Sequence, residues 1–113
     1  MKNIHLIARF KIHEGKLRDF KDGVDSCIAV VKNEPGTMLY DWFIDEENLE
    51  CTVVETYKDS DATLAHAANV NELLQKLMEI ADFSAEVFGN TTEELKGALA
   101  GMNIGTVPLY KGL

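Results

Sequence analysis

The spacing of apolar residues changes along the chain between the strand pattern and the helix pattern. The order of these changes restricts the fold more than any other feature. Residues 3–12 alternate between apolar and polar side chains, which is the pattern of a half-buried strand. From Leu17 to Val31 the apolar residues instead recur at helical spacing, and Glu34-Pro35-Gly36 ends that helix. Residues 37–45 and 50–57 are again strand-like, and the loop between them is short enough for a hairpin. The first half of the chain therefore predicts a strand, a helix and a β-hairpin.

The second half continues with helical and strand patterns. Residues 60–68 and 71–81 have helical periodicity, and we expect Asn69-Val70-Asn71 to break or bend the helix between them. Residues 83–88 have the length and composition of another strand. The resulting order predicts an α+β fold of the ferredoxin-like, split βαβ type, in which helices cover one face of an antiparallel four-stranded sheet.

Residues 91–113 form an addition to this arrangement, within a single domain that spans residues 1–113. Thr91 followed by Glu94 fits a capping box, which predicts the start of a further helix. Residues 107–110 predict a short edge strand, where the proline that they contain is tolerated.

Charge and composition exclude several classes of partner. The formal net charge of −8 disfavours nucleic acids and anionic membranes, because both require a basic surface. We expect a cytoplasmic protein, because no apolar run approaches the length of a membrane span and the N-terminus lacks a signal-type apolar region.

Cys27 and Cys51 lack metal-like spacing and are expected to be buried thiols. The sequence shows neither a three-residue metal set nor a glycine-rich phosphate loop, so no metal site is predicted.

Residues 37–44 predict how the domain assembles. Large apolar side chains occupy both faces of this strand, including Met38, Leu39, Trp42 and Phe43. Since helices cover only one face of the sheet, we expect a homodimer in which two sheets face each other. The alternative is a monomer with a modest exposed apolar patch.

A candidate pocket follows from the periodicity of residues 55–69. Glu55 and Tyr57 are two residues apart, so they project from the same face of a strand. His66 and Asn69 are three residues apart on the following helix and share one of its faces. If that helix face packs over the strand face, the four side chains converge on one small volume.

Each of these residues also has a purely structural interpretation. Glu55 can pair with Arg9 or Lys11 on a neighbouring strand at the dimer face, because strand periodicity does not say which face Glu55 and Tyr57 share. His66 can instead bond a strand backbone, and Tyr57 can simply fill the core.

Two short motifs resemble a known family. Glu34-Pro35-Gly36-Thr37 leads into Tyr40-x-Trp42-Phe43, and Glu55-x-Tyr57 precedes Ser60-Asp61-Ala62-x-Leu64-Ala65-His66. In this order and spacing they resemble the antibiotic biosynthesis monooxygenase (ABM) family of dimeric α+β barrels, over roughly residues 1–90. The resemblance implies a ferredoxin-like monomer, a homodimer joined through its sheets, and a pocket between sheet and helices in each subunit.

The resemblance also implies a function. Some members of the family oxygenate phenols or quinols without metal or flavin, so we expect a cofactor-independent monooxygenase of a small phenolic or quinol substrate. His66 is the expected base, because imidazole titrates near neutrality, and His66 and Tyr57 are the predicted catalytic residues. Asn69, Trp42 and Glu55 are predicted to bind the small aromatic molecule.

Two other functions use the same pocket. One is a non-catalytic dimer that binds a small molecule, and the other is an isomerase or decarboxylase. Haem degradation, which occurs in one branch of the family, is not expected. That branch relies on an Asn of the first strand, and Ala8 stands at the matching position here.

Overall fold

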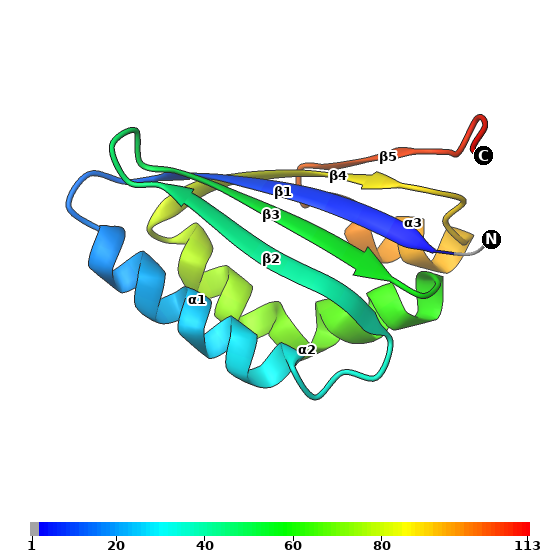
Figure 1. Ribbon diagram of the computed structural model, residues 1–113, viewed down its shortest axis with the longest axis horizontal. Coiled ribbons are helices and arrows are strands. Elements are labelled where there is room, and N and C mark those ends of the chain that lie inside the picture. The colour runs from blue at the N-terminus through cyan, green and yellow to red at the C-terminus, as the bar shows by residue number, and fades with distance from the viewer. Residues whose placement is uncertain (1–2) are drawn as a thin grey trace.

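The chain folds into one sheet with its helices packed against a single face, as the computed structural model of residues 3–113 shows (Figure 1). The elements follow one another as β1 (Ile4–Ile12), α1 (Leu17–Val31), β2 (Thr37–Asp45), β3 (Glu50–Tyr57), α2 (Ser60–Met78), β4 (Ala81–Phe88), α3 (Glu93–Leu99) and β5 (Ile104–Val107). Within these residues the sheet has five strands in the order β2-β3-β1-β4-β5. The predicted α+β, ferredoxin-like fold is confirmed.

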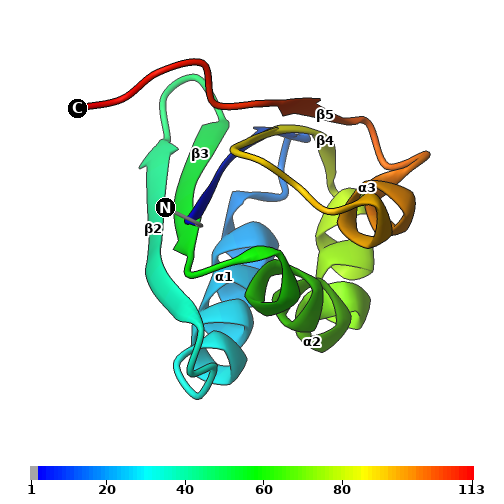
Figure 2. The same cartoon turned by 90° about the vertical axis from the view of Figure 1, so that its right-hand side faces the viewer.

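The sheet differs from the predicted one at its C-terminal edge. The strands β2, β3, β1 and β4 pair antiparallel, as expected. The fifth strand, β5, pairs parallel with β4, so the complete sheet is mixed rather than wholly antiparallel. Figure 2 shows α3 beside α2, on the side of the domain where β4 and β5 lie. The C-terminal addition therefore extends the sheet and the helical layer together.

The core lies between the helices and the central strand. β1 pairs with β3 on one side and β4 on the other, and its alternate residues from Ile4 to Ile12 are buried beneath the helices. Phe10 packs edge-on against Phe20 of α1, with ring centroids 5.2 Å apart, and stacks on Trp42 of β2 at 5.8 Å. Both cysteines are buried, unpaired thiols in the described structure, as predicted.

The predicted break in the second helix is wrong, because α2 runs without interruption from Ser60 to Met78. Asp59 caps its start by accepting a hydrogen bond from the backbone N–H of Ala62 at 2.8 Å. At the expected break, the Asn69 side chain bonds groups outside its own helix and so does not compete for the backbone of α2. Val70 is buried, and this anchors the helix to the core.

Three boundaries near the C-terminus also differ from the prediction. β4 begins at Ala81, which pairs with Ile12, rather than at residue 83. Thr92, and not Thr91, caps α3 by accepting from the N–H of Leu95 at 3.1 Å, so the proposed capping box does not form. The edge strand ends at Val107 instead of beginning there, because proline at the next position has no N–H to continue the ladder.

The sheet face away from the helices carries exposed apolar side chains on β2. Met38 is 60% exposed, Leu39 38% and Phe43 56%. Tyr40 and Trp42 point the other way and pack against the core. The strand is therefore apolar on both faces, as the sequence indicates, while the homodimer inferred from this pattern stays a prediction.

No helix within residues 3–113 has the length and apolar character needed to cross a membrane.

Candidate functional site

A cavity of about 520 Å³ lies between the helix-covered face of the sheet and the helices. Most of its lining is apolar and comes from every strand of the sheet and from all three helices of residues 3–113. The ionisable side chains in this lining that carry strong hydrogen bonds are Glu55 of β3 and His66 of α2. The cavity thus combines a largely apolar wall with a small polar cluster.

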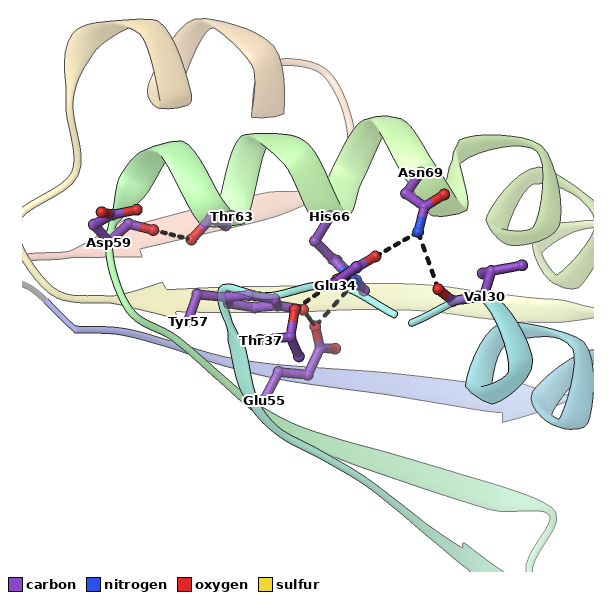
Figure 3. Close-up of polar contacts among 9 residues, drawn as sticks. All are labelled: Val30, Glu34, Thr37, Glu55, Tyr57, Asp59, Thr63, His66 and Asn69. Carbon is purple, nitrogen blue, oxygen red and sulfur yellow. Dashed lines mark hydrogen bonds and ion pairs between the residues drawn. The ribbon is translucent and has the colours of Figure 1, made fainter. Parts of the chain in front are cut away.

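Glu55 and Tyr57 occupy the helix-covered face of β3 and are buried, at 5% and 0% exposure. The Tyr57 hydroxyl donates a hydrogen bond to Oε1 of Glu55 (Figure 3). The structural alternative, in which Glu55 pairs with Arg9 or Lys11 at the dimer face, is therefore wrong. Both of those basic side chains are exposed on the opposite face of β1.

His66 lies between two carboxylates. Its Nδ1 is 3.0 Å from Oε1 of Glu34, and its Nε2 is 3.6 Å from Oε1 of Glu55. The imidazole also packs against Tyr40 and Tyr57, with ring centroids 5.2 and 4.9 Å away. The structure therefore brings together Glu55, Tyr57 and His66, three of the four side chains that the sequence predicts to converge. The alternative in which His66 bonds a strand backbone is not seen, because the imidazole of His66 bonds the side chain of Glu34.

Asn69 is placed differently from the prediction. Its side chain is exposed and does not line the cavity. Its Nδ2 instead donates to Oε2 of Glu34 at 2.7 Å and to the backbone oxygen of Val30 at 3.3 Å (Figure 3). Tyr57 does not line the cavity either, because it is covered completely. Tyr57 and Asn69 therefore lie outside the cavity, and their hydrogen bonds hold Glu55 and Glu34 in place.

Glu34 is the residue of this cluster that sequence reasoning did not select. It accepts hydrogen bonds from Thr37 at 2.5 Å and from Asn69, and it contacts His66. In the sequence, Glu34 stands out only as part of the Glu-Pro-Gly-Thr motif, and that motif predicts the end of a helix and not a site. Gly36 brings this loop against α2, since a Cβ on Gly36 would lie 2.5 Å from the Cβ of Ala62.

Burial sets the protonation states of the cluster. It raises the pKa of Glu55 to about 8, and it lowers the pKa of His66 although Glu34 acts in the opposite direction. Burial alone would raise the pKa of Glu34, but hydrogen bonds from Thr37 and Asn69 and the contact with His66 lower it overall. Near neutral pH, Glu34 is thus ionised, His66 is neutral and Glu55 largely keeps its proton.

These states give the cluster both an acid and a base. The ionised Glu34 favours the tautomer of His66 with its proton on Nδ1, which leaves Nε2 free to accept a proton. The Glu55 carboxyl beside it holds a proton that it can donate. Two titratable groups whose pKa values are moved apart by their surroundings are the usual arrangement for acid–base chemistry.

Trp42 lines the cavity, but its indole N–H is covered. Among the described residues its buried Nε1 has no hydrogen-bond partner. A buried N–H without a partner is unfavourable, so this group lowers the stability of the protein. Residues 3–113 contain no cluster of three or more His, Cys, Asp or Glu side chains that could hold a metal ion.

Replacing Glu34 with glutamine tests its effect on His66. We expect the pKa of His66 in Glu34→Gln to fall further below its value in the unmodified protein, because the negative charge that favours the imidazolium is lost. NMR titration of the histidine rings measures this change, with the exposed His5 and His13 as internal references. An unchanged His66 titration would contradict the proposed contact between the two side chains.

Comparison with known proteins agrees with the fold. The family model for antibiotic biosynthesis monooxygenase matches residues 3–79. MupZ from Pseudomonas fluorescens is 25% identical, with a TM-score of 0.89 over 100% of this chain and 94% of its own. A conserved protein from Methanosarcina mazei is 22% identical, with a TM-score of 0.71 over 77% of this chain and 91% of its own.

A structure described as a cofactor-independent oxygenase is also similar. This protein, SnoaB from Streptomyces nogalater, is 14% identical, with a TM-score of 0.69 over 81% of this chain and 96% of its own. At this identity the similarity concerns the fold alone. No curated protein sequence matches the chain.

Proposed function

This chain belongs to the antibiotic biosynthesis monooxygenase family, and we propose that it is a cofactor-independent monooxygenase of a phenolic or quinol substrate. The observation that carries the proposal is the position of His66. Glu34 bonds its Nδ1 at 3.0 Å, while its Nε2 faces the Glu55 side of a largely apolar cavity. A base held in one tautomer beside an apolar space is suited to removing a phenolic proton.

The substrate supplies the electrons in this reaction. Nε2 of His66 takes the hydroxyl proton, and the resulting anion is electron-rich enough to reduce oxygen. One oxygen atom is added to the ring, the other leaves as water, and the balance is RH₂ + O₂ → RO + H₂O. The indole of Trp42 can pack against the substrate ring, and the protonated Glu55 can return a proton to the reduced oxygen. Tyr57 and Asn69 act as positioning residues for Glu55 and Glu34.

Oxygen consumption tests the proposal. We expect the protein to consume oxygen with hydroquinone or 1,4-dihydroxynaphthalene, with one atom from ¹⁸O₂ in the product, in buffer containing a metal chelator. An oxygen electrode and mass spectrometry measure the two quantities. Uptake no faster than without protein, or a product that lacks the label, would overturn the proposed oxygenation.

A second function is favoured by the Glu55–His66 pair. A protonated carboxyl and a neutral imidazole 3.6 Å apart can add a proton at one position of a substrate and remove one at another. This is the chemistry of an isomerase, and it needs no oxygen. Turnover of a substrate that continues under nitrogen would favour this function over oxygenation.

We also propose that two copies pair through the outer sheet face. The exposed Met38, Leu39 and Phe43 support this, because a patch of large apolar side chains on one strand is costly to leave in water. Phe43→Glu is expected to lower the mass measured by sedimentation from that of a dimer to that of a monomer. Ile28→Glu, at a similarly exposed position on α1, is the control and should leave the dimer intact. A monomeric unmodified protein would contradict the proposal.

A further inference from the structure

The C-terminal addition forms one wall of the cavity. Its residues Ala98, Leu99, Met102 and Ile104 line the cavity, and we call them the C-terminal wall. They belong to α3, to β5 and to the turn between them, all beyond residue 79, where the family match ends. The shape of the cavity is therefore set in part by a segment that the family model does not include.

The C-terminal wall lies across the sheet from the polar cluster. Glu55 is on β3 and Ile104 is on β5, and β1 and β4 lie between these strands. Neighbouring strands are about 4.8 Å apart, so the two residues are separated by roughly 14 Å across the sheet. The cavity thus extends from its polar cluster at β3 and α2 to an apolar region at the opposite edge.

The volume of the cavity exceeds what a single aromatic ring requires. A cavity of about 150 Å³ is enough to hold one benzene molecule, whereas this cavity measures about 520 Å³. A ring bound at Glu55 and His66 would leave the region beside Leu99 and Met102 to be filled. Apolar side chains line that region, so an apolar group would fill it most favourably.

Part of the cavity lining is exposed to solvent. Of the side chains that line it, Ala68 and Asn71 of α2 and Ala98 of α3 are solvent-exposed. Two of these three residues are alanines, whose small side chains leave space for a ligand to enter. Exposed lining is therefore found on α2 and at the C-terminal wall, which includes Ala98.

We infer that the substrate carries an apolar extension of several carbon atoms on its hydroxylated ring, and that the C-terminal wall selects for this extension. The identity of the hydroxylated end rests on the proposed function. The extension rests on the cavity itself. A chain of methylenes in this region should increase affinity by about fourfold for each methylene that is fully buried.

Binding under nitrogen tests the inference separately from turnover. Trp42 is the single tryptophan of the chain and lines the cavity, so quenching of its fluorescence reports binding. The probes are hydroquinone, 2-methylhydroquinone and 2-n-butylhydroquinone. We expect the butyl compound to bind at least about tenfold more tightly than hydroquinone.

Two phenylalanine variants locate the extension. Ala98→Phe should remove most of the gain that the butyl group gives and change the affinity for hydroquinone much less, because the added ring shortens the apolar region beside Leu99 and Met102. Ala100→Phe places the same ring at an exposed position of the same segment that does not line the cavity, and should behave as the unmodified protein.

The outcomes separate this inference from the proposed reaction. Chain-dependent binding without oxygen uptake would overturn the monooxygenase and leave the substrate shape standing. Equal affinities across the series, no quenching by any probe, or equal effects of the two variants would overturn the role of the C-terminal wall.

Discussion

His66→Gln is expected to lower the rate of oxygen uptake with a quinol by about 10²–10⁴-fold, the usual contribution of a general base. Glutamine is close in size to histidine and can still donate a hydrogen bond to Glu34, but its amide does not accept a proton at neutral pH. The rate with the unmodified protein should fall as the pH decreases below the pKa of His66, because the imidazolium cannot act as a base. Oxygen-electrode rates between pH 5 and 9 measure both effects.

His13→Gln is the matched control, because His13 is exposed and does not line the cavity, and its ring is 3.0 Å from Asp82. Circular dichroism must show that His66→Gln remains folded, since His66 is buried between Glu34 and Glu55. A folded His66→Gln protein with an unchanged rate would show that another group removes the proton.

Glu55→Gln is expected to make the protein more stable at alkaline pH. Burial raises the pKa of Glu55 from 4.5 to about 8. Between these pH values the unfolded chain has lost this proton while the folded chain keeps it, so rising pH favours unfolding by about 1.4 kcal/mol for each unit. Below pH 4.5 the carboxyl is protonated in both states and contributes no such difference. Well above pH 8 both states have lost the proton, and the stability does not fall further on account of Glu55.

Glutamine does not titrate, so the variant should lack this loss. Its amide oxygen can still accept the hydrogen bond from Tyr57. We expect the free energy of unfolding of Glu55→Gln to exceed that of the unmodified protein by more than about 2 kcal/mol at pH 9 and to approach it near pH 4.5. Urea unfolding at a series of pH values measures the difference. Glu86→Gln changes an exposed carboxylate on β4 and keeps Glu55, so its stability curve should run parallel to that of the unmodified protein. Parallel curves for Glu55→Gln and the unmodified protein would contradict the buried, protonated carboxyl.

The sequence predicted most of the fold because its local patterns agree with the tertiary structure. Alternation along residues 3–12 located the first strand, since one of its faces lies against the core, and the strand-like composition of residues 37–45 and 50–57 located the hairpin. Prediction failed at Asn69, where a residue that often interrupts helices bonds Glu34 and Val30 instead of its own backbone. Such long-range partners leave no periodic signal.

Part of the candidate site could also be predicted, because local spacing along a strand or a helix indicates which side chains share a face. Spacing within one element placed Glu55 beside Tyr57, and helix periodicity placed His66 over them. Spacing could not indicate that Asn69 faces away from the cavity, because one helix face is wide enough to reach both the cavity and α1. It also gave no sign of Glu34, which enters the cluster through the contact between Gly36 and Ala62. Contacts between loops and helices depend on three-dimensional packing.

The central place of β1 has a consequence for how the protein acquires its structure. Ile4 pairs with Tyr57 and Ile12 pairs with Ala81, so β1 can complete its pairing with β3 only once residue 57 is available and can begin to pair with β4 only once residue 81 is available. Pairings that are distant along the chain slow folding, because a long loop must close before they form. During synthesis, the backbone N–H and C=O groups along both edges of β1 therefore stay unpaired with other strands until β3 and β4 emerge. The cavity can be completed only once β5, which supplies Ile104 to its lining, is available.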